Sequence, residues 1–261
     1  MLRSLIFVPA KEKMLQKISN MEADAVIIDL EDSVEDADKG NALIRVKQYL
    51  SANSLSQSVY VRLNSGNYEE EAKSLSRIGN VGFMLPKFED VRAYSKCEGI
   101  WDAHSVIALV ETPMGIVNMN SIASCSWVDA VAFGAEDYTC MVNMENTPES
   151  LYYQKSRLNT YCKAYKKLSF DTPSFCVDDY EKFKKEVDSA VSLGFSGKLL
   201  IHPKHIEYIN QAFGSCDIPS LKKIVDQYDE AGLAVLVIEG RVYEKMHIDR
   251  MRRIIKENSK I

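Results

Sequence analysis

The segment Ser105–Gly115, SVIALVETPMG, constrains the fold of this chain more than any other stretch. Its apolar run, residues 106–110, ends in one carboxylate, Glu111, and Pro113 follows at a position suited to the start of a helix. A short apolar run that ends in a turn signal is typical of a strand buried on both faces, as in a parallel sheet. Because α/β proteins bind ligands at the carboxyl ends of such strands, Glu111 is a candidate site residue.

A second segment, Ala130–Asp137 (AVAFGAED), repeats this design as an apolar strand that ends in Gly134, Glu136 and Asp137. Two acids at strand ends, Glu111 and Asp137, predict a site of hard oxygen ligands for a divalent cation. Gly134 serves either close packing or the approach of a ligand to the backbone.

Strand-like segments recur along the chain with amphipathic helical stretches between them, the pattern of repeated βα units. Eight strands in 261 residues predict a (β/α)8 TIM barrel over residues 1–213, followed by a C-terminal helical extension over 214–261. An open doubly wound sheet is the rival fold, but the sequence lacks its glycine-rich nucleotide-binding motifs. The strands are expected at 3–9, 25–31, 59–64, 81–87, 105–112, 130–137, 169–175 and 198–203.

Composition narrows the function. A hydrophobic content of 46% with 26% charged residues is ordinary for a globular protein, and the formal net charge of −5 argues against nucleic acid as a partner. Because no stretch reaches the roughly 18 apolar residues of a membrane span and no signal peptide is recognisable, we expect a cytoplasmic protein with no membrane partner. Scattered cysteines predict reduced thiols instead of a disulfide framework or a metal knuckle. They are Cys97, Cys125, Cys140, Cys162, Cys176 and Cys216.

In a barrel, polar side chains at the strand ends converge on one mouth. Arg62 lies between two apolar residues, where burial of a charge is costly without a partner, and its planar guanidinium suits two-pronged binding of a carboxylate. Structural roles are the alternative: Glu111 would pair with Lys87 or Arg62, and Asp29 and Glu31 would bind neighbouring strands. The predicted mouth holds Asp29, Glu31, Arg62, Asn64, Lys87, Glu111, Glu136, Asp137 and His202.

Seven blocks of sequence, in order, resemble the citrate lyase β-subunit-like branch of the HpcH/HpaI aldolase family. The resemblance covers most of the chain and implies a (β/α)8 barrel that acts on acyl-CoA thioesters with Mg²⁺. The blocks are RSLIFVP at 3–9, DAVIIDLEDSV at 24–34, VRLN at 61–64, MLPKFED at 84–90, ALVETPMGIVN at 108–118, AFGAEDY at 132–138 and GFSGKLLIHPKHIEYINQAF at 194–213.

On the matching positions, the resemblance implies that Glu111 and Asp137 hold Mg²⁺ and that Arg62 binds the carboxylate of the substrate. It also implies that Asp29 and Glu31 bind metal-coordinated water. Further substrate-binding candidates are Gly134, Ala135 and Lys39, although Lys39 is otherwise read most simply as a solvated helix charge.

The C-terminal segment is expected to contact a neighbouring subunit. The run AVLVIEG, residues 234–240, is too apolar for a free tail and has no ninth place in a closed barrel. The resemblance implies a homo-oligomer, usually a trimer, in which an acid of this segment lies over a neighbour's site. Glu244 stands where an Asp is expected in that role. Alternatively, Glu244 opens the final helix as an acid that compensates the helix dipole.

The sequence therefore predicts a Mg²⁺-dependent carbon–carbon lyase. Its substrate would be a 3-hydroxy-carboxyacyl-CoA of the citryl-, citramalyl- or malyl-CoA type, and its products acetyl-CoA and a 2-oxo acid such as oxaloacetate, pyruvate or glyoxylate. Two alternatives stay open: a class II aldolase that releases pyruvate from a CoA-free hydroxy-oxo acid, and a non-catalytic binding or regulatory member of the family. Ala10, where a Gly is usual, and the segment 138–150 depart from the family pattern, so the substrate stays open.

Overall fold

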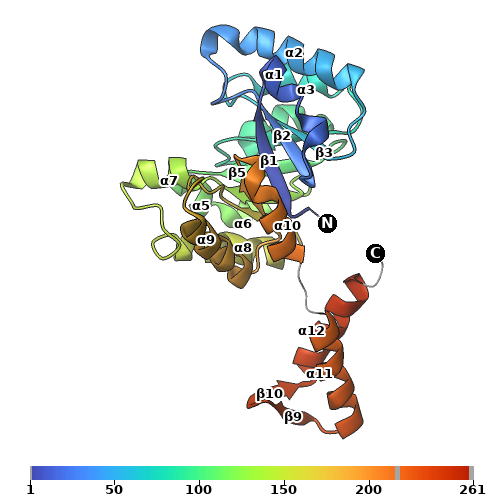
Figure 1. The fold of residues 1–261 in the computed structure, drawn as a ribbon. Helices are drawn as coiled ribbons and strands as arrows, with labels where there is room; N and C mark the ends of the chain where they lie inside the picture. The colour runs from blue at the N-terminus through green and yellow to red at the C-terminus, as the bar shows by residue number, and fades with distance from the viewer. Residues whose placement is uncertain (1, 215–217, 259–261) are drawn as a thin grey trace. The chain divides into compact units, whose positions relative to one another are not determined.

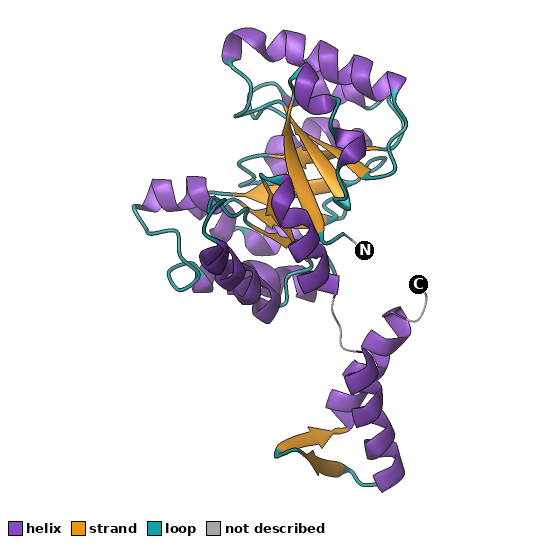
Figure 2. Ribbon diagram, viewed as in Figure 1, coloured by secondary structure: helices purple, strands orange, loops and turns teal. Residues whose placement is uncertain are grey.

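Eight parallel strands close into a barrel in the computed structural model, which describes residues 2–214 and 218–258 (Figures 1 and 2). Each strand pairs with the next in sequence, and β8 pairs with β1 to complete the ring. The predicted (β/α)8 fold is confirmed. The strands are β1 (Ser4–Pro9), β2 (Ala25–Asp29), β3 (Ser58–Arg62), β4 (Val81–Leu85), β5 (Val106–Val110), β6 (Ala130–Phe133), β7 (Leu168–Asp171) and β8 (Gly197–Leu200).

Helices connect the strands and cover the outside of the barrel (Figure 2). Short 3₁₀ segments lie between them, namely η1 (Ile18–Asn20), η2 (Asp36–Asp38), η3 (Val91–Cys97) and η4 (Pro203–His205). The helices are α1 (Glu12–Leu15), α2 (Lys39–Ala52), α3 (Tyr68–Leu75), α4 (Glu98–Trp101), α5 (Pro113–Val117), α6 (Met119–Ser124), α7 (Ala135–Val142), α8 (Tyr152–Ala164), α9 (Tyr180–Leu193) and α10 (Ile206–Gly214).

Alternate residues of each strand belong to two different apolar clusters, because successive side chains of a strand point to opposite faces. Leu5, Ile27 and Leu109 belong to the cluster that fills the barrel lumen. Ile6 and Val26 belong to the larger cluster between the barrel and its helices. Burial on both faces explains why the strands read as continuous apolar runs in the sequence.

Local signals set where elements begin and end. Pro113 is the first residue of α5, as predicted, and the Thr112 hydroxyl accepts a hydrogen bond from the Gly115 N–H at 3.1 Å. All eight predicted strands are longer than the observed ones, most of them because the chain leaves the sheet earlier at the carboxyl end. The chain leaves β6 after Phe133 and enters α7, so Asp137 lies in the first turn of a helix and not at a strand end.

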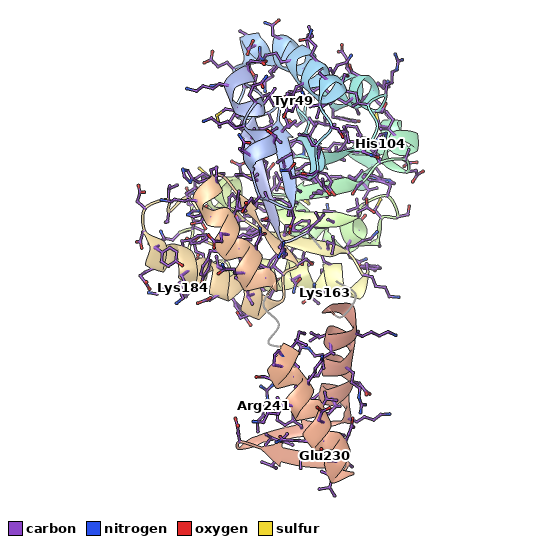
Figure 3. The ribbon with its side chains drawn as sticks, turned by 45° about the vertical axis from the view of Figure 1, so that its right-hand side comes forward. Tyr49, His104, Lys163, Lys184, Glu230 and Arg241 are labelled. Carbon is purple, nitrogen blue, oxygen red and sulfur yellow. The ribbon has the colours of Figure 1, made fainter. Side chains whose placement is uncertain are left out.

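Residues 214–261 form a second compact unit. Its described elements are α11 (Ile218–Ala231), β9 (Val235–Ile238), β10 (Arg241–Glu244) and α12 (Lys245–Asn258), and Figure 3 labels Glu230 and Arg241 within it. The predicted apolar strand is β9, which forms an antiparallel hairpin with β10. Glu239 and Gly240 connect the strands with positive φ values of 49° and 78°, as a two-residue hairpin turn requires.

The second unit has a small core. Val225, Tyr243 and Ile248 are buried within it, whereas Val235 and Val237 of β9 are 50% and 61% exposed. Within the described residues, no helix is long and apolar enough to cross a membrane. Five of the six cysteines have free thiols, and Cys216 lies outside the described residues.

Candidate functional site

Three charged residues continue the lumen-facing series of the barrel at its carboxyl end. Because every second residue of a strand faces the lumen, Asp29 follows Ile27 on β2, and Arg62 is the last residue of β3. Glu111 follows Leu109 in the same way, one residue beyond the end of β5. All three charged side chains are at least 92% buried. The barrel alternation therefore brings them to one mouth, as the sequence predicted.

Glu111 is held by the backbone of the β4–α4 connection. Its Oε1 atom accepts a hydrogen bond from the Lys87 N–H at 2.7 Å, and Lys87 has a positive φ of 48°. Burial raises the pKa of Glu111 to about 8; the Lys87 N–H opposes this effect, and the charge of Asp137 adds to it. Burial therefore favours the protonated form of this carboxyl group, and a nearby cation would favour its ionised form.

Gly134 provides the space that the Glu111 side chain occupies. A Cβ atom at Gly134 would lie 2.6 Å from Glu111 Cβ and 2.7 Å from Glu111 Oε2. The Gly134 N–H donates to the Val110 carbonyl at 2.9 Å, which fixes this backbone against β5. The Ala135 N–H donates to the Thr172 hydroxyl at 3.1 Å. Both residues line the site, but their N–H groups already have partners.

Asp137 reaches the same cavity from the first turn of α7. This cavity of about 380 Å³ is lined by Glu111, Asp137 and Arg62 among others. Asp137 is exposed and lies on a helix. Of the two acids predicted at strand ends, Glu111 alone directly follows a strand. No group of three or more His, Cys, Asp or Glu side chains in the described part of the chain is arranged to hold a metal ion. Two carboxylates nevertheless suit Mg²⁺, which usually keeps several water ligands.

Arg62 is surrounded by acids. Its Nε and Nη2 atoms donate to the two oxygens of Asp29 at 2.7 and 2.8 Å, and its Nη1 lies 2.9 Å from Asp32 Oδ2 and 3.6 Å from Glu31 Oε2. Phe7 covers the guanidinium, with 5.0 Å between Cζ and the ring centroid. Asp29 occupies the Nε–Nη2 edge of the guanidinium, so a substrate carboxylate would have to approach from the side of Nη1. The two-pronged contact of Arg62 with a substrate stays a prediction.

The Asp29 carboxylate pairs with Arg62, and hydrogen bonds from the protein occupy both of its oxygens. Besides Arg62, its oxygens accept hydrogen bonds from the Glu31 and Ser33 N–H groups at 2.9 and 3.0 Å. Burial opposes the ionisation of Asp29, but the hydrogen bonds and charge of Arg62, together with the hydrogen bonds from Glu31 and Ser33, outweigh it and lower its pKa. Asp29 thus orients the Arg62 guanidinium, and its contact with metal-coordinated water stays a prediction. Burial raises the pKa of Glu31, whose oxygens have ion-pair contacts but no hydrogen bond within the described residues.

Comparisons with known proteins identify the family of this chain. The sequence model of the HpcH/HpaI aldolase/citrate lyase family matches residues 3–203, most of the chain. The chain belongs to this family. It is 28% identical to the citrate lyase subunit beta of Leuconostoc mesenteroides subsp. cremoris, over 97% of this chain and 92% of that protein. It is 27% identical to the human mitochondrial citramalyl-CoA lyase, over 85% of this chain and 72% of that protein.

A solved structure shares the fold with a ligand in place. The citrate lyase beta subunit of M. tuberculosis, complexed with oxaloacetate and magnesium, has a TM-score of 0.68 to this chain at 25% identity. The match covers 81% of this chain and 96% of that one. The relatives named here are lyases, so the family assignment agrees with the enzyme class that the sequence predicted.

Not every predicted residue lines the cavity of Glu111. Lys39 donates to Asn64 Oδ1 and to the Glu31 carbonyl, and it lines a neighbouring cavity of about 960 Å³ together with Glu31 and Lys87. Glu244 ends β10 and directly precedes α12 in the second unit. Its predicted roles, over a neighbour's site or at the start of the final helix, both stay predictions.

Two features of the structure were not predicted from the sequence. Asp32, the acid on Arg62 Nη1, lies in the DLED block but was given no role. A buried ion cluster joins β7, β8 and α8: Asp171 lies 2.9 Å from Lys155 Nζ and 2.6 Å from Lys198 Nζ. Nothing in the sequence marks these lysines, because each stands among ordinary helix or strand residues. His202, predicted at the mouth, accepts a hydrogen bond from the Lys204 N–H at 3.2 Å.

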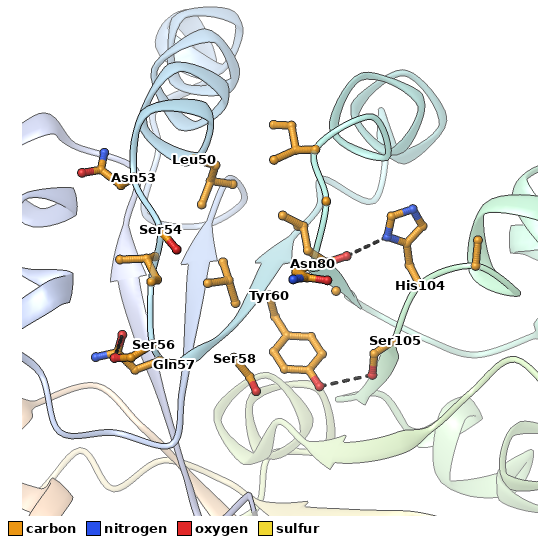
Figure 4. Close-up of a pocket in the computed structure, with 17 residues that line it drawn as sticks. Leu50, Asn53, Ser54, Ser56, Gln57, Ser58, Tyr60, Asn80, His104 and Ser105 are labelled. Carbon is orange, nitrogen blue, oxygen red and sulfur yellow. Dashed lines mark hydrogen bonds between the residues drawn. The ribbon is translucent and has the colours of Figure 1, made fainter.

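A further cavity of about 850 Å³ lies at the amino-terminal end of the barrel (Figure 4). Tyr60 and Ser105 share a hydrogen bond of 3.2 Å there, and His104 Nδ1 donates to the Val81 carbonyl at 2.8 Å. Its walls carry hydroxyl and amide groups and no acid, lysine or arginine. Since barrel enzymes react at the opposite end, this cavity is separate from the chemistry proposed below.

Proposed function

We propose that this protein is a Mg²⁺-dependent carbon–carbon lyase that cleaves a 3-hydroxy-carboxyacyl-CoA into acetyl-CoA and a 2-oxo acid. The observation that carries the proposal is the meeting of Arg62, Glu111 and Asp137 around one cavity at the carboxyl end of the barrel. Citrate lyase and citramalyl-CoA lyase relatives, which match most of this chain, support the same reaction class.

The donor set fits Mg²⁺. Glu111 and Asp137 offer hard oxygen ligands, and burial raises the pKa of Glu111 to about 8, so a cation bound beside it would favour the ionised form that ligates a metal. Gly134 keeps the Glu111 carboxylate in the cavity, and the Lys87 N–H fixes one of its oxygens. When bound, Mg²⁺ stabilises the negative charge that develops on the hydroxyl oxygen of the substrate.

Arg62 is proposed to bind the substrate carboxylate through Nη1. Asp29 holds the other edge of the guanidinium, so the donor is already oriented before substrate arrives. Asp32 contacts the same Nη1 and its side chain is 58% exposed, so it is the partner that a substrate carboxylate would displace. Glu31, more deeply buried, stays behind the guanidinium.

Cleavage breaks the bond between the hydroxyl-bearing carbon and the α-carbon of the thioester. The hydroxyl group loses its proton and becomes the oxo group of the 2-oxo acid, while the bonding electrons pass to the α-carbon as an enolate. The enolate takes up one proton and becomes acetyl-CoA, so protons balance. A carboxylic acid over the site would supply this proton.

Glu244 of another subunit is proposed as that acid. The second unit exposes the valines of β9 on a hairpin that ends at Glu244, and an exposed apolar strand of this kind favours burial in an interface. We therefore propose a homo-oligomer, a trimer by resemblance to the family. Mixing Glu244→Gln subunits with Asp137→Asn subunits tests the shared site. Activity should return in mixed oligomers; full subunit exchange without recovery would exclude it.

The function itself is tested by a lyase screen with citryl-, citramalyl- and malyl-CoA, with and without Mg²⁺. Acetyl-CoA release that needs Mg²⁺ is expected from at least one thioester. Cleavage of a CoA-free hydroxy-oxo acid to pyruvate, with all thioesters intact, would identify a class II aldolase instead. Binding of Mg²⁺ and a 2-oxo acid without any turnover would identify a non-catalytic member.

A further inference from the structure

The cavity of Glu111 has two chemically different sides, and strand alternation explains both. On β2, β3 and β5 the lumen-facing series ends in charged residues, as described above. On β1 and β8 the same series continues with apolar residues: Phe7 follows Leu5, and Ile201 follows Leu199. Leu199 of β8, which is 0% exposed, forms the buried part of this apolar side, and Leu109, 2% exposed, lies beneath Glu111 on β5.

Cations are scarce around the cavity. Its lining contains one basic residue, Arg62, against five acids, so the formal charge is 1 − 5 = −4, or −2 with one divalent cation bound. Arg62 already pairs with two of these acids. The acids are Asp29, Asp32, Glu111, Glu136 and Asp137.

The lysines closest to this region are engaged elsewhere. Lys87 lies 3.4 Å from Glu31 Oε1 and lines the neighbouring cavity, as Lys39 does. Lys155 is buried 2.9 Å from Asp171. Within the described residues that line this cavity, Arg62 is the one basic residue, and it packs on Phe7 while it pairs with Asp29 and Asp32, so a second carboxylate on the apolar side would have no lysine or arginine of its own.

We propose that the 2-oxo acid released by this protein carries one carboxylate and an apolar substituent, as pyruvate does, and that the dicarboxylate oxaloacetate is rejected. This inference rests on the proposed lyase function. With the single carboxylate on the charged side, the substituent at the oxo carbon faces Leu109 and Leu199. A methyl group gains from burial there, whereas a carboxylate would lose its water without a compensating charge.

The matching thioester is thus of the citramalyl type and not of the citryl type. Leaving one buried charged group unpaired typically lowers affinity by about 100-fold or more. We expect the kcat/KM for citryl-CoA to fall below that for citramalyl-CoA by at least this factor. Phe7 packs on the Arg62 guanidinium, with 5.0 Å between Cζ and the ring centroid, so the apolar side begins at the ring that covers this cation.

Binding of the free 2-oxo acids gives a readout that does not depend on turnover. Calorimetric titration of the full chain with pyruvate and with freshly dissolved oxaloacetate, each in the presence of Mg²⁺, should show much tighter binding of pyruvate. Pyruvate formed by decarboxylation is measured at the end of each oxaloacetate run. Equal or tighter binding of oxaloacetate would overturn the proposal, because a cation from elsewhere would then complete the site.

Ile201 offers a matched pair of variants. It lines the apolar side and is 36% exposed, so a long charged side chain is tolerated at this position. Ile201→Lys supplies the missing cation and should improve oxaloacetate binding at least tenfold, whereas Ile201→Met, of similar length without charge, should not. If both variants bind oxaloacetate equally well, the missing cation is not what excludes it.

The lyase function and the proposed substrate class can be contradicted by different results. If no thioester is cleaved, the lyase function is wrong, while the calorimetric order of pyruvate and oxaloacetate still tests the cavity argument. If citryl-CoA is cleaved as fast as citramalyl-CoA, the lyase function holds and the proposed substrate class is wrong.

Discussion

Gly134→Ala is expected to damage the site through Glu111 alone. The new Cβ would lie 2.6 Å from Glu111 Cβ and 2.7 Å from Glu111 Oε2, whereas ordinary van der Waals contacts begin at 3.4 Å, so Glu111 must move by about 3.4 − 2.6 = 0.8 Å. Overpacking of this kind costs about 1–3 kcal/mol. Gly134 has a φ of −101°, which Ala adopts without strain. Because Ala lowers the conformational entropy of the unfolded chain, the substitution also stabilises the fold by about 0.4–1 kcal/mol.

The net loss therefore lies between about 1 − 1 = 0 and 3 − 0.4 = 2.6 kcal/mol, or a fall in Tm of up to about 10 °C for a chain of this size. Mg²⁺ affinity should fall at least about tenfold, because Glu111 cannot keep both its Lys87 hydrogen bond and its position in the cavity. Scanning calorimetry and Mg²⁺ titration measure the two effects. Gly99→Ala in α4 is the control, since no atom lies within 4 Å of the added Cβ. Unchanged Tm and Mg²⁺ affinity in Gly134→Ala would refute the reasoning.

Three further predictions concern charges. Asp32→Asn should tighten 2-oxo acid binding several-fold in calorimetry by freeing Arg62 Nη1, and weaker binding would show that Asp32 contacts the ligand. Asp171→Asn leaves Lys155 and Lys198 buried without an anion and should lower the free energy of unfolding by about 3–5 kcal/mol in urea; a loss below about 1 kcal/mol would contradict this. Burial opposes ionisation of Asp171, but the lysines outweigh it and lower its pKa below 3.8. Its stabilisation is therefore present above about pH 4 and lost as pH falls further, and Asp171→Asn should show a weaker acid dependence of the urea midpoint.

The barrel was predictable because its physical cause is visible in the sequence. A strand buried on both faces must be apolar throughout, so β5 and β6 stand out as runs that end abruptly in polar residues. The same alternation explains why Arg62 and Glu111 reach the mouth. Asp137 was predicted on a strand because only two residues separate Glu136 and Asp137 from the end of β6. The short α7 that contains them has no clear apolar periodicity that would mark it as a helix in the sequence.

Contacts within the site were not predictable. The sequence predicts that Asp29 and Arg62 lie near one edge of the sheet. Only the structure shows that the two Asp29 oxygens accept hydrogen bonds from Arg62 Nε and Nη2. Register between strands decides this, and register depends on the whole ring of strands. The buried ion pair of Lys198 with Asp171 was not predicted for the same reason. Nothing in the sequence of either strand shows which residue of the neighbouring strand lies beside it.

Mg²⁺ titration of Asp137→Asn tests the central claim most directly. Glu136→Gln is the matched control, because Glu136 lines the same cavity one residue away but is bound to Asn146 at 2.7 Å. The account predicts at least about tenfold weaker Mg²⁺ binding in Asp137→Asn and nearly unchanged binding in Glu136→Gln. Asp137→Asn binding Mg²⁺ as tightly as the parent protein would contradict it.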